Sequence, residues 1–140
     1  MAIRIKIKIE CGDKSLETSA LVNSGFETET PQLILPLEAA KLLGLWPPTQ
    51  NAKIEEYDTA GGPVIMWVYQ NILKVRIEEP IKSKLINCDA VISNIEDEVL
   101  ISDKLAGELN IIGEDFGKGL WRLRGEASIF ESEKPRKWKK

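Results

Sequence analysis

The amino-acid sequence predicts a mostly β protein whose strands close, or nearly close, into a barrel carrying two short helices. Three observations lead to this fold class. Apolar and charged residues alternate strictly near the start, short apolar runs bounded by turn residues recur along the chain, and only two segments carry helix start and stop signals. The strand–helix–strand rhythm of a parallel α/β sheet is absent. With 140 residues, the chain fits one such domain.

The first two strands are predicted to form a hairpin. Isoleucine stands at every second position from Ile3 to Ile9 with charged residues between, which is the pattern of a strand with one buried face. Gly12 and Asp13 then mark a turn within residues 11–14. Residues 15–22 continue in extended form and end in an apolar run.

A short strand and a helix are predicted next. Residues 33–35 are apolar, and Pro36 stands at a first helical position. Glu38 in the first turn, Lys41 near the end and Gly44 just past it match the preferences of helix termini.

The second half of the chain predicts a glycine-tipped hairpin, further strands and a second helix. Two extended runs between residues 52 and 77 meet at residues 59–63, where paired glycines supply the positive φ angles of a tight reversal. Ser102 can cap a helix over residues 103–109, and Asn110 can take the left-handed conformation after it. The remaining strands are expected at residues 85–92, 99–101, 111–112 and 120–123.

Composition narrows the possible functions. Hydrophobic residues make up 43% and charged residues 29%, as in a soluble globular protein with a real core. No apolar run approaches the roughly 20 residues of a membrane helix and the N-terminus is unlike a signal peptide, so we expect a cytoplasmic protein with no membrane span. The absence of histidine excludes Ser-His-Asp and Cys-His catalysis and histidine metal sites, and we expect neither metal nor cofactor. In that compartment, Cys11 and Cys88 are expected as free thiols in preference to a disulfide.

Charge divides the chain into an acidic body and a basic end. Residues 131–140 hold five basic and two acidic residues, a net +3, so the overall charge of −3 leaves −6 on residues 1–130. Nucleic acid is therefore not the expected main partner, because phosphate binding requires a positive surface. We predict a barrel domain over residues 1–130 and a basic, flexible tail over residues 131–140. The alternative is a tail in which Trp138 and the lysines contact RNA, lipid headgroups or an acidic protein.

One segment carries a functional pattern. Residues 20–25 read Ala-Leu-Val-Asn-Ser-Gly, and a Leu-Pro step at residues 35–36 opens a helix that ends in Leu-Leu-Gly-Leu at residues 42–45. This order resembles the active-site region of the retropepsin-like aspartic peptidases, in which two apolar residues precede Asp-Thr/Ser-Gly. Residues 99–109 resemble the second apolar run and helix of that fold, although Ser102 stands where the family usually has Gly.

The likeness extends over most of residues 1–125. The Gly61-Gly62 tip lies where the flap of the family would be, and residues 119–123 resemble the end of its barrel. The resemblance implies a homodimer with one catalytic Asp per chain and an extended peptide or an unfolded protein as substrate. The residues implied to close over the substrate are Ala60, Gly61, Gly62 and Pro63.

Asn23 stands at the position of the catalytic Asp, and Ser24 and Gly25 would shape the turn around it. Two facing carboxylates divide acid and base roles between them, whereas an amide takes no proton from water near neutral pH. The chain as written is therefore predicted to be inactive. Asn23 is either an inactivating substitution or the residue of a natural non-catalytic member.

Other interpretations of the same residues stay open. Asn-Ser-Gly is also a common turn sequence. The fold can serve a non-catalytic peptide-binding or scaffold domain, since strand addition needs no carboxylate, or a nucleic-acid binder that uses residues 134–140. Glu27, Glu29 and the acidic run at residues 96–98 are expected to be solvated rather than to bind a metal. The tryptophans Trp46, Trp67 and Trp121 are expected as core or interface anchors, with Trp67 and Met66 as alternative substrate contacts.

Overall fold

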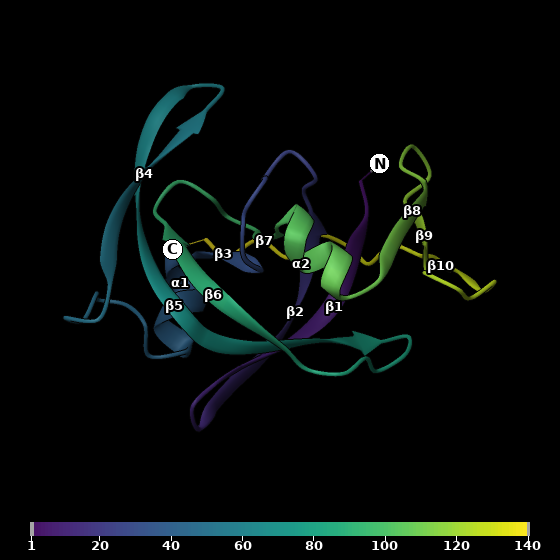
Figure 1. Ribbon diagram of the computed structural model, residues 1–140, viewed down its shortest axis with the longest axis horizontal. Helices are drawn as coiled ribbons and strands as arrows, with labels where there is room; N and C mark the ends of the chain where they lie inside the picture. The colour runs from purple at the N-terminus through teal and green to yellow at the C-terminus, as the bar shows by residue number, and fades with distance from the viewer. Residues whose placement is uncertain (1, 140) are drawn as a thin grey trace.

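The computed structural model describes residues 2–139 apart from the side chain of Thr59 (Figure 1). Its helices are short: α1 spans Leu37–Leu42 and α2 spans Asp103–Glu108. The strands are β1 (Arg4–Cys11), β2 (Lys14–Val22), β3 (Gln32–Pro36), β4 (Lys53–Thr59), β5 (Gly62–Glu79), β6 (Ile86–Ser93), β7 (Val99–Ile101), β8 (Ile111–Asp115), β9 (Leu120–Leu123) and β10 (Ile129–Glu131).

Six strands close into the predicted barrel. The main sheet has the order β1-β2-β7-β3-β6-β5-β4, and β1 also pairs with β5, which joins the two sides and leaves β4 outside the ring. Strand β5 belongs to both parts: its first half pairs with β4 and its second half with β1. The β4–β5 hairpin therefore projects from the barrel as an arm (Figure 1).

The alternation at the N-terminus builds the core of the barrel. Ile3, Ile5, Ile7 and Ile9 are each at most 1% exposed, and they join a cluster contributed by the other barrel strands and both helices. The intervening charged residues lie on the outer face. The period-2 pattern thus predicts correctly which face of this strand is buried.

Both helices form, although Pro36, predicted at the first helical position, is extended and lies one residue before α1. Pro36 is the cap residue just before α1, Glu38 and Lys41 form an ion pair of 3.0 Å, and Gly44 has a φ of +75°. At α2, the hydroxyl of Ser102 accepts a hydrogen bond from the N–H of Leu105. Asn110 follows with a φ of +62°, as predicted.

The last three strands form a sheet of their own with β9 between β8 and β10. Residues 119–123, expected at the end of the barrel, therefore lie outside the ring. Trp121 and Leu123 nevertheless face the barrel core, because alternate side chains of β9 are buried. Alternating apolar residues can thus be buried by a strand that packs against the barrel as well as by a strand that belongs to it.

The C-terminal segment returns across the molecule from β10 and contacts its body (Figure 1). The Trp138 indole N–H donates to the hydroxyl of Thr18 on β2, and the ring packs against the main core. Lys137 forms an ion pair with Glu98, which also binds Arg4. Residues of the predicted basic tail thus contact β1, β2 and the segment before β7. None of the helices described is long and apolar enough to cross a membrane.

Candidate functional site

The turn after β2 positions Asn23. The N–H of Asn23 donates to the carbonyl of Ile101 at 3.0 Å, which extends the parallel β2–β7 ladder by one residue. The chain then reverses: the N–H of Phe26 donates to the Asn23 carbonyl at 3.0 Å, and the N–H of Gly25 donates to Asn23 Oδ1 at 3.1 Å. A Cβ on Gly25 would lie 3.3 Å from that same oxygen, so glycine permits this close approach.

The start of α2 holds the other end of the turn. The N–H of Asp103 donates to the carbonyl of Phe26, and the Asp103 carboxylate accepts a hydrogen bond from the N–H of Thr28 at 3.0 Å. Asn23 is half-buried, whereas Ser24 and Gly25 are exposed. The turn is therefore fixed by β7 and α2 but presents its tip at the surface.

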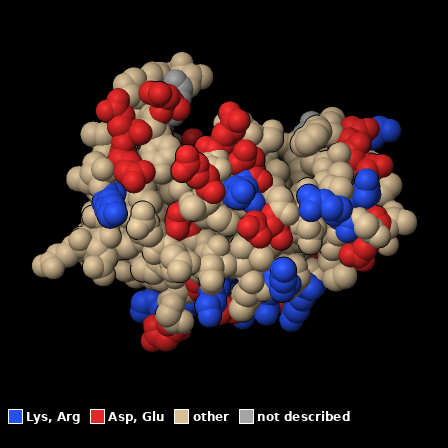
Figure 2. Space-filling model, viewed as in Figure 1, with Lys and Arg blue, Asp and Glu red and all other residues tan. Residues whose placement is uncertain are grey.

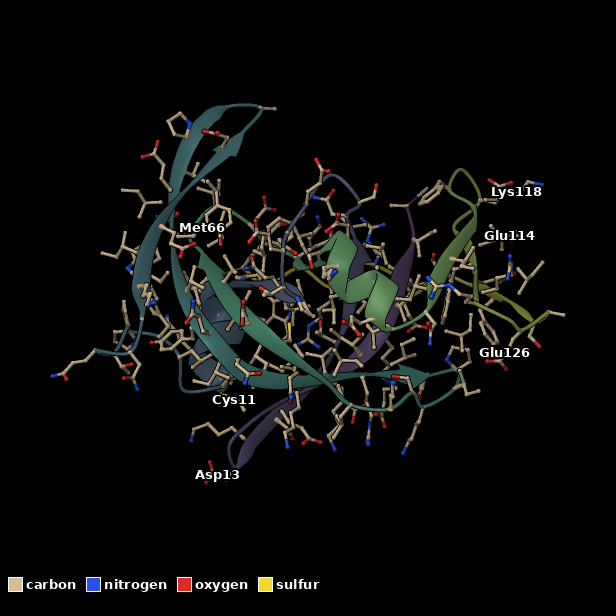
Figure 3. All side chains as sticks on the ribbon, in the orientation of Figure 1. Cys11, Asp13, Met66, Glu114, Lys118 and Glu126 are labelled. Carbon is tan, nitrogen blue, oxygen red and sulfur yellow. The ribbon has the colours of Figure 1, made fainter. Side chains whose placement is uncertain are left out.

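The inner face of the β4–β5 hairpin lies above this turn. The register pairs Tyr57 with Val64 and Glu55 with Met66, so these side chains share one face. Met66 points from the hairpin toward the body (Figure 3) and packs in a second apolar cluster with Ile34 and Leu100. The hairpin and the turn are also joined by an aromatic pair, since the ring centroids of Tyr57 and Phe26 lie 6.3 Å apart.

A hollow of about 470 Å³ separates the hairpin from the turn, a volume in the range of ordinary ligand sites. Its floor is apolar and its rim polar. It brings together two of the predicted regions, since Asn23 and Gly25 lie on one side and Ala60 on the other. The described residues that line it are Asn23, Gly25, Phe26, Ile34, Tyr57, Asp58, Ala60, Met66, Glu96 and Leu100.

The other predicted site residues lie near this hollow but do not line it. Ser24 is exposed at the tip of the turn and is not among the lining residues. Ala60 and Gly61 make the two-residue turn of the hairpin, after which Gly62 and Pro63 begin β5, and Gly62 takes a φ of +107°. The expected tight reversal is present, and Ala60 is the part of it that reaches the hollow.

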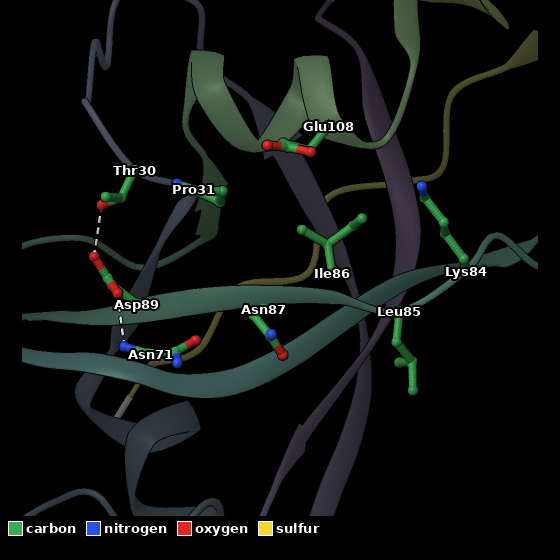
Figure 4. Close-up of a pocket in the computed structure, with 9 residues that line it drawn as sticks. All are labelled: Thr30, Pro31, Asn71, Lys84, Leu85, Ile86, Asn87, Asp89 and Glu108. Atoms are coloured by element: carbon green, nitrogen blue, oxygen red, sulfur yellow. Dashed lines mark hydrogen bonds between the residues drawn. The ribbon is translucent and has the colours of Figure 1, made fainter.

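A second hollow continues along the hairpin on the far side of Tyr57. Its lining includes Glu27 and Glu29 from the loop before β3, and Glu55 from β4. Asp89 and Thr30 lie at its far end and also line the neighbouring pocket drawn in Figure 4. There the Asp89 carboxylate accepts hydrogen bonds of 2.7 Å from the Thr30 hydroxyl and from the N–H of Asn71. We call the two hollows together the hairpin groove.

The lining of the hairpin groove is acidic. Its described lining includes six acidic residues and no lysine or arginine: Glu27, Glu29, Glu55, Asp58, Asp89 and Glu96. Acidic side chains also gather on the hairpin and the adjoining surface in Figure 2, with a few basic ones among them, whereas basic side chains are more numerous along the lower edge and at the right. Burial and the nearby Glu55 and Asp89 raise the pKa of Tyr57 to about 12.

Glu96 and Tyr57 were not predicted as site residues. Glu96 was expected to be solvated, but it is half-buried, and burial together with Asp97 and Glu98 raises its pKa. Tyr57 was within reach of the sequence, since a two-residue turn at the glycine tip sets the hairpin register and hence its inner face.

Met66 and Trp67, the two residues considered as substrate contacts, lie on opposite faces of the hairpin. Met66 lines the groove, whereas Trp67 points to the opposite face and packs edge-on against Trp46 at 4.8 Å between ring centroids. Successive residues of a strand face opposite sides, so both cannot contact one ligand. Trp67 is an anchor for the base of the hairpin.

The groove was also compared with metal sites and with known proteins. Within residues 2–139, no group of three or more histidine, cysteine, aspartate or glutamate residues is arranged to hold a metal ion. No protein-family model matches the chain, and a search of curated proteins gives no match either.

Proposed function

We propose that this chain has the framework of a retropepsin-like aspartic endopeptidase that acts as a homodimer and binds an extended peptide in the hairpin groove. Asn23 occupies the catalytic position, so the chain as written binds its peptide without cutting it. The observation that carries the proposal is the hydrogen bond from the Gly25 N–H to Asn23 Oδ1 on one side of the hollow, with the hairpin on the other side. A carboxylate at position 23 would accept the same bond.

The chemistry follows from that exchange of amide for carboxylate. With aspartate at position 23, the Gly25 N–H would favour the ionised form. Two such groups from two chains share one proton: one takes a proton from water as it attacks the peptide carbonyl, and the other protonates the carbonyl oxygen. A proton then passes to the departing amine as the C–N bond breaks. Asparagine performs neither transfer.

The exposure of the turn supports a two-fold site. One chain supplies one residue at position 23, and the exposed Ser24 and Gly25 leave the turn accessible to a second copy. The hairpin supports the peptide-binding part, because Ala60 at its tip and Met66 on its inner face lie across the hollow from Asn23.

The experiment restores the carboxylate. We expect Asn23→Asp to cleave casein between pH 3 and 7 at a rate at least about 10²-fold above that of the unchanged chain. Activity per chain should rise with protein concentration as dimers form, which sedimentation velocity measures in parallel. Asn94→Asp is the matched control, because it adds the same charge at an exposed position outside the groove lining. A folded, dimeric Asn23→Asp protein without cleavage activity would contradict the peptidase assignment.

A second candidate function is non-catalytic peptide binding on the same framework. It is favoured by the amide at position 23 and by β4, which stands at the end of the strand order with β5 as its one strand neighbour in the described part of the chain. Such an edge can accept an added strand. This function predicts peptide binding that persists while Asn23→Asp remains inactive.

A further inference from the structure

We infer that the hairpin groove selects extended peptides that carry lysine or arginine side chains. The inference rests on the proposed peptide-binding function and adds the chemical class of the peptide. It rests on the shape and the charge of the groove together: two adjoining, partly apolar hollows that meet at Tyr57, with acidic residues in the lining of both and no lysine or arginine among their described lining residues.

The carboxylates are placed on both walls. Glu55 comes from the inner face of the hairpin, and Glu27 and Glu29 come from the loop opposite. Glu96 adds a further carboxylate at the Asn23 end. An extended peptide lying between these walls places alternate side chains toward opposite sides. Basic side chains of the peptide would therefore face acidic residues whichever wall they point toward.

These acidic residues form no direct ion pair with the described basic residues, although the charge of Lys137 acts on Glu96 from a longer distance. No ion pair joins a lysine or arginine of the described chain to any of the six groove carboxylates, whereas Glu17, Glu38, Glu78, Glu79, Glu98 and Glu114 elsewhere have such partners. Among the described residues, the donors to the Asp89 carboxylate are neutral: the Thr30 hydroxyl, the Gln32 amide and the N–H of Asn71. Like charges confined in one groove repel each other, and a cationic ligand relieves that repulsion.

Apolar contacts would supply affinity, and charge would supply selection. Phe26, Tyr57 and Met66 offer aromatic and thioether surface in the floor, against which the aliphatic stem of a lysine or arginine packs while its charged head reaches the rim. An acidic peptide or a nucleic-acid backbone would add negative charge to the same channel. Complementary charge of this kind governs specificity and association rate more than total affinity.

The experiment uses three unstructured twelve-residue peptides that differ only in four positions, filled with lysine, glutamine or glutamate. Binding to the full-length chain is measured by fluorescence anisotropy in 50 mM and 300 mM NaCl. We expect the lysine peptide to bind about tenfold more tightly than the glutamine peptide at low salt, with the difference reduced at high salt. The glutamate peptide should bind most weakly.

Charge-neutral variants assign the preference to the groove. Glu27→Gln, Glu29→Gln and Glu55→Gln combined should bring the lysine peptide to within about threefold of the glutamine peptide. The matched control combines Glu126→Gln, Glu131→Gln and Glu133→Gln, three exposed positions outside the groove lining that change the net charge equally. Glu126 lies at the opposite end of the molecule from the hairpin (Figure 3). The control should keep the full preference.

The outcomes separate this inference from the proposed function. Equal binding of the lysine and glutamine peptides would overturn the inference and leave the peptide groove in place. A lysine preference that both triple variants retain equally would also overturn it, because the acidic body as a whole would then be responsible. Binding of none of the three peptides, together with an inactive Asn23→Asp protein, would remove the proposed function as well.

Discussion

The two halves of β5 show how one continuous strand serves two purposes. In its second half, Val75 and Ile77 are fully buried between β1 and β6 in the barrel. In its first half, Ile65 is 56% exposed and pairs only with β4, while Met66 on the other face covers a small apolar cluster. Stability is therefore concentrated in the barrel, and the hairpin that covers the groove is supported from one face. Segments with few buried contacts open at low free-energy cost, as a binding arm requires.

The largest expected effect comes from removing the same side-chain volume from each half of β5 and comparing the loss of stability. We expect Ile77→Ala to lower the free energy of unfolding by about 2–5 kcal/mol, because it leaves a cavity in a closed core. Ile65→Ala, its matched control on the same strand, should cost less than about 0.5 kcal/mol. Urea unfolding followed by tryptophan fluorescence measures both. Equal losses would mean that the hairpin is as firmly packed as the barrel.

A smaller effect distinguishes ion pairs of the barrel framework from those at its surface. Arg4 Nε and Nη2 bind the two oxygens of Glu98 at 2.8 and 3.1 Å, and Glu98 is only 6% exposed. Arg4→Met leaves this carboxylate with Lys137 alone, so we expect a loss of about 2–3 kcal/mol in unfolding free energy.

The control for that measurement is Lys6→Met on the same strand. Lys6 contacts Glu17 and Glu79 at 3.8 and 3.6 Å, and both partners are well exposed. Exposed pairs of this kind contribute about 0–1 kcal/mol. If Arg4→Met and Lys6→Met lower the free energy of unfolding equally in the same urea titration, the Arg4–Glu98 pair does not stabilise the barrel more than an exposed pair does.

The sequence predicts the parts of this molecule that depend on neighbours in the chain. Alternation identifies the buried face of β1, and the glycine pair predicts a reversal within residues 59–63, where the structure has the turn at residues 60–61. The turn chemistry of Asn23 and Gly25 is likewise local. Each of these features requires only that a residue satisfy its own backbone or its immediate neighbours.

Features that join distant segments are not written in any local pattern. The parallel pairing of Val22 with Ile101, the inclusion of β9 in a separate sheet and the docking of Trp138 on Thr18 each depend on how whole elements pack. The groove carboxylates illustrate the same point, because Glu27 and Glu55 come from segments that only the folded barrel brings together. A solvated charge and a groove-lining charge look identical in sequence.

The smallest predicted effect is a difference in the pH dependence of stability between Glu96 and Glu98, which lie two residues apart in the chain. Glu96 lines the groove, whereas Glu98 pairs with Arg4 in the barrel framework. The hydrogen bond from Arg4 holds the pKa of Glu98 below its ordinary value of 4.5, so its contribution to stability is present at neutral pH and is lost as the pH falls through the lowered pKa. Burial raises the pKa of Glu96, so its ionised form opposes folding at neutral pH and protonation removes that cost.

Glu98→Gln should therefore destabilise the protein at pH 7 and progressively less toward pH 3. Glu96→Gln should leave it at least as stable at pH 7, with the difference vanishing in acid. Urea unfolding at pH 7, 5 and 3.5 measures both trends, and parallel behaviour of the two variants would show that the groove and the framework share one electrostatic environment.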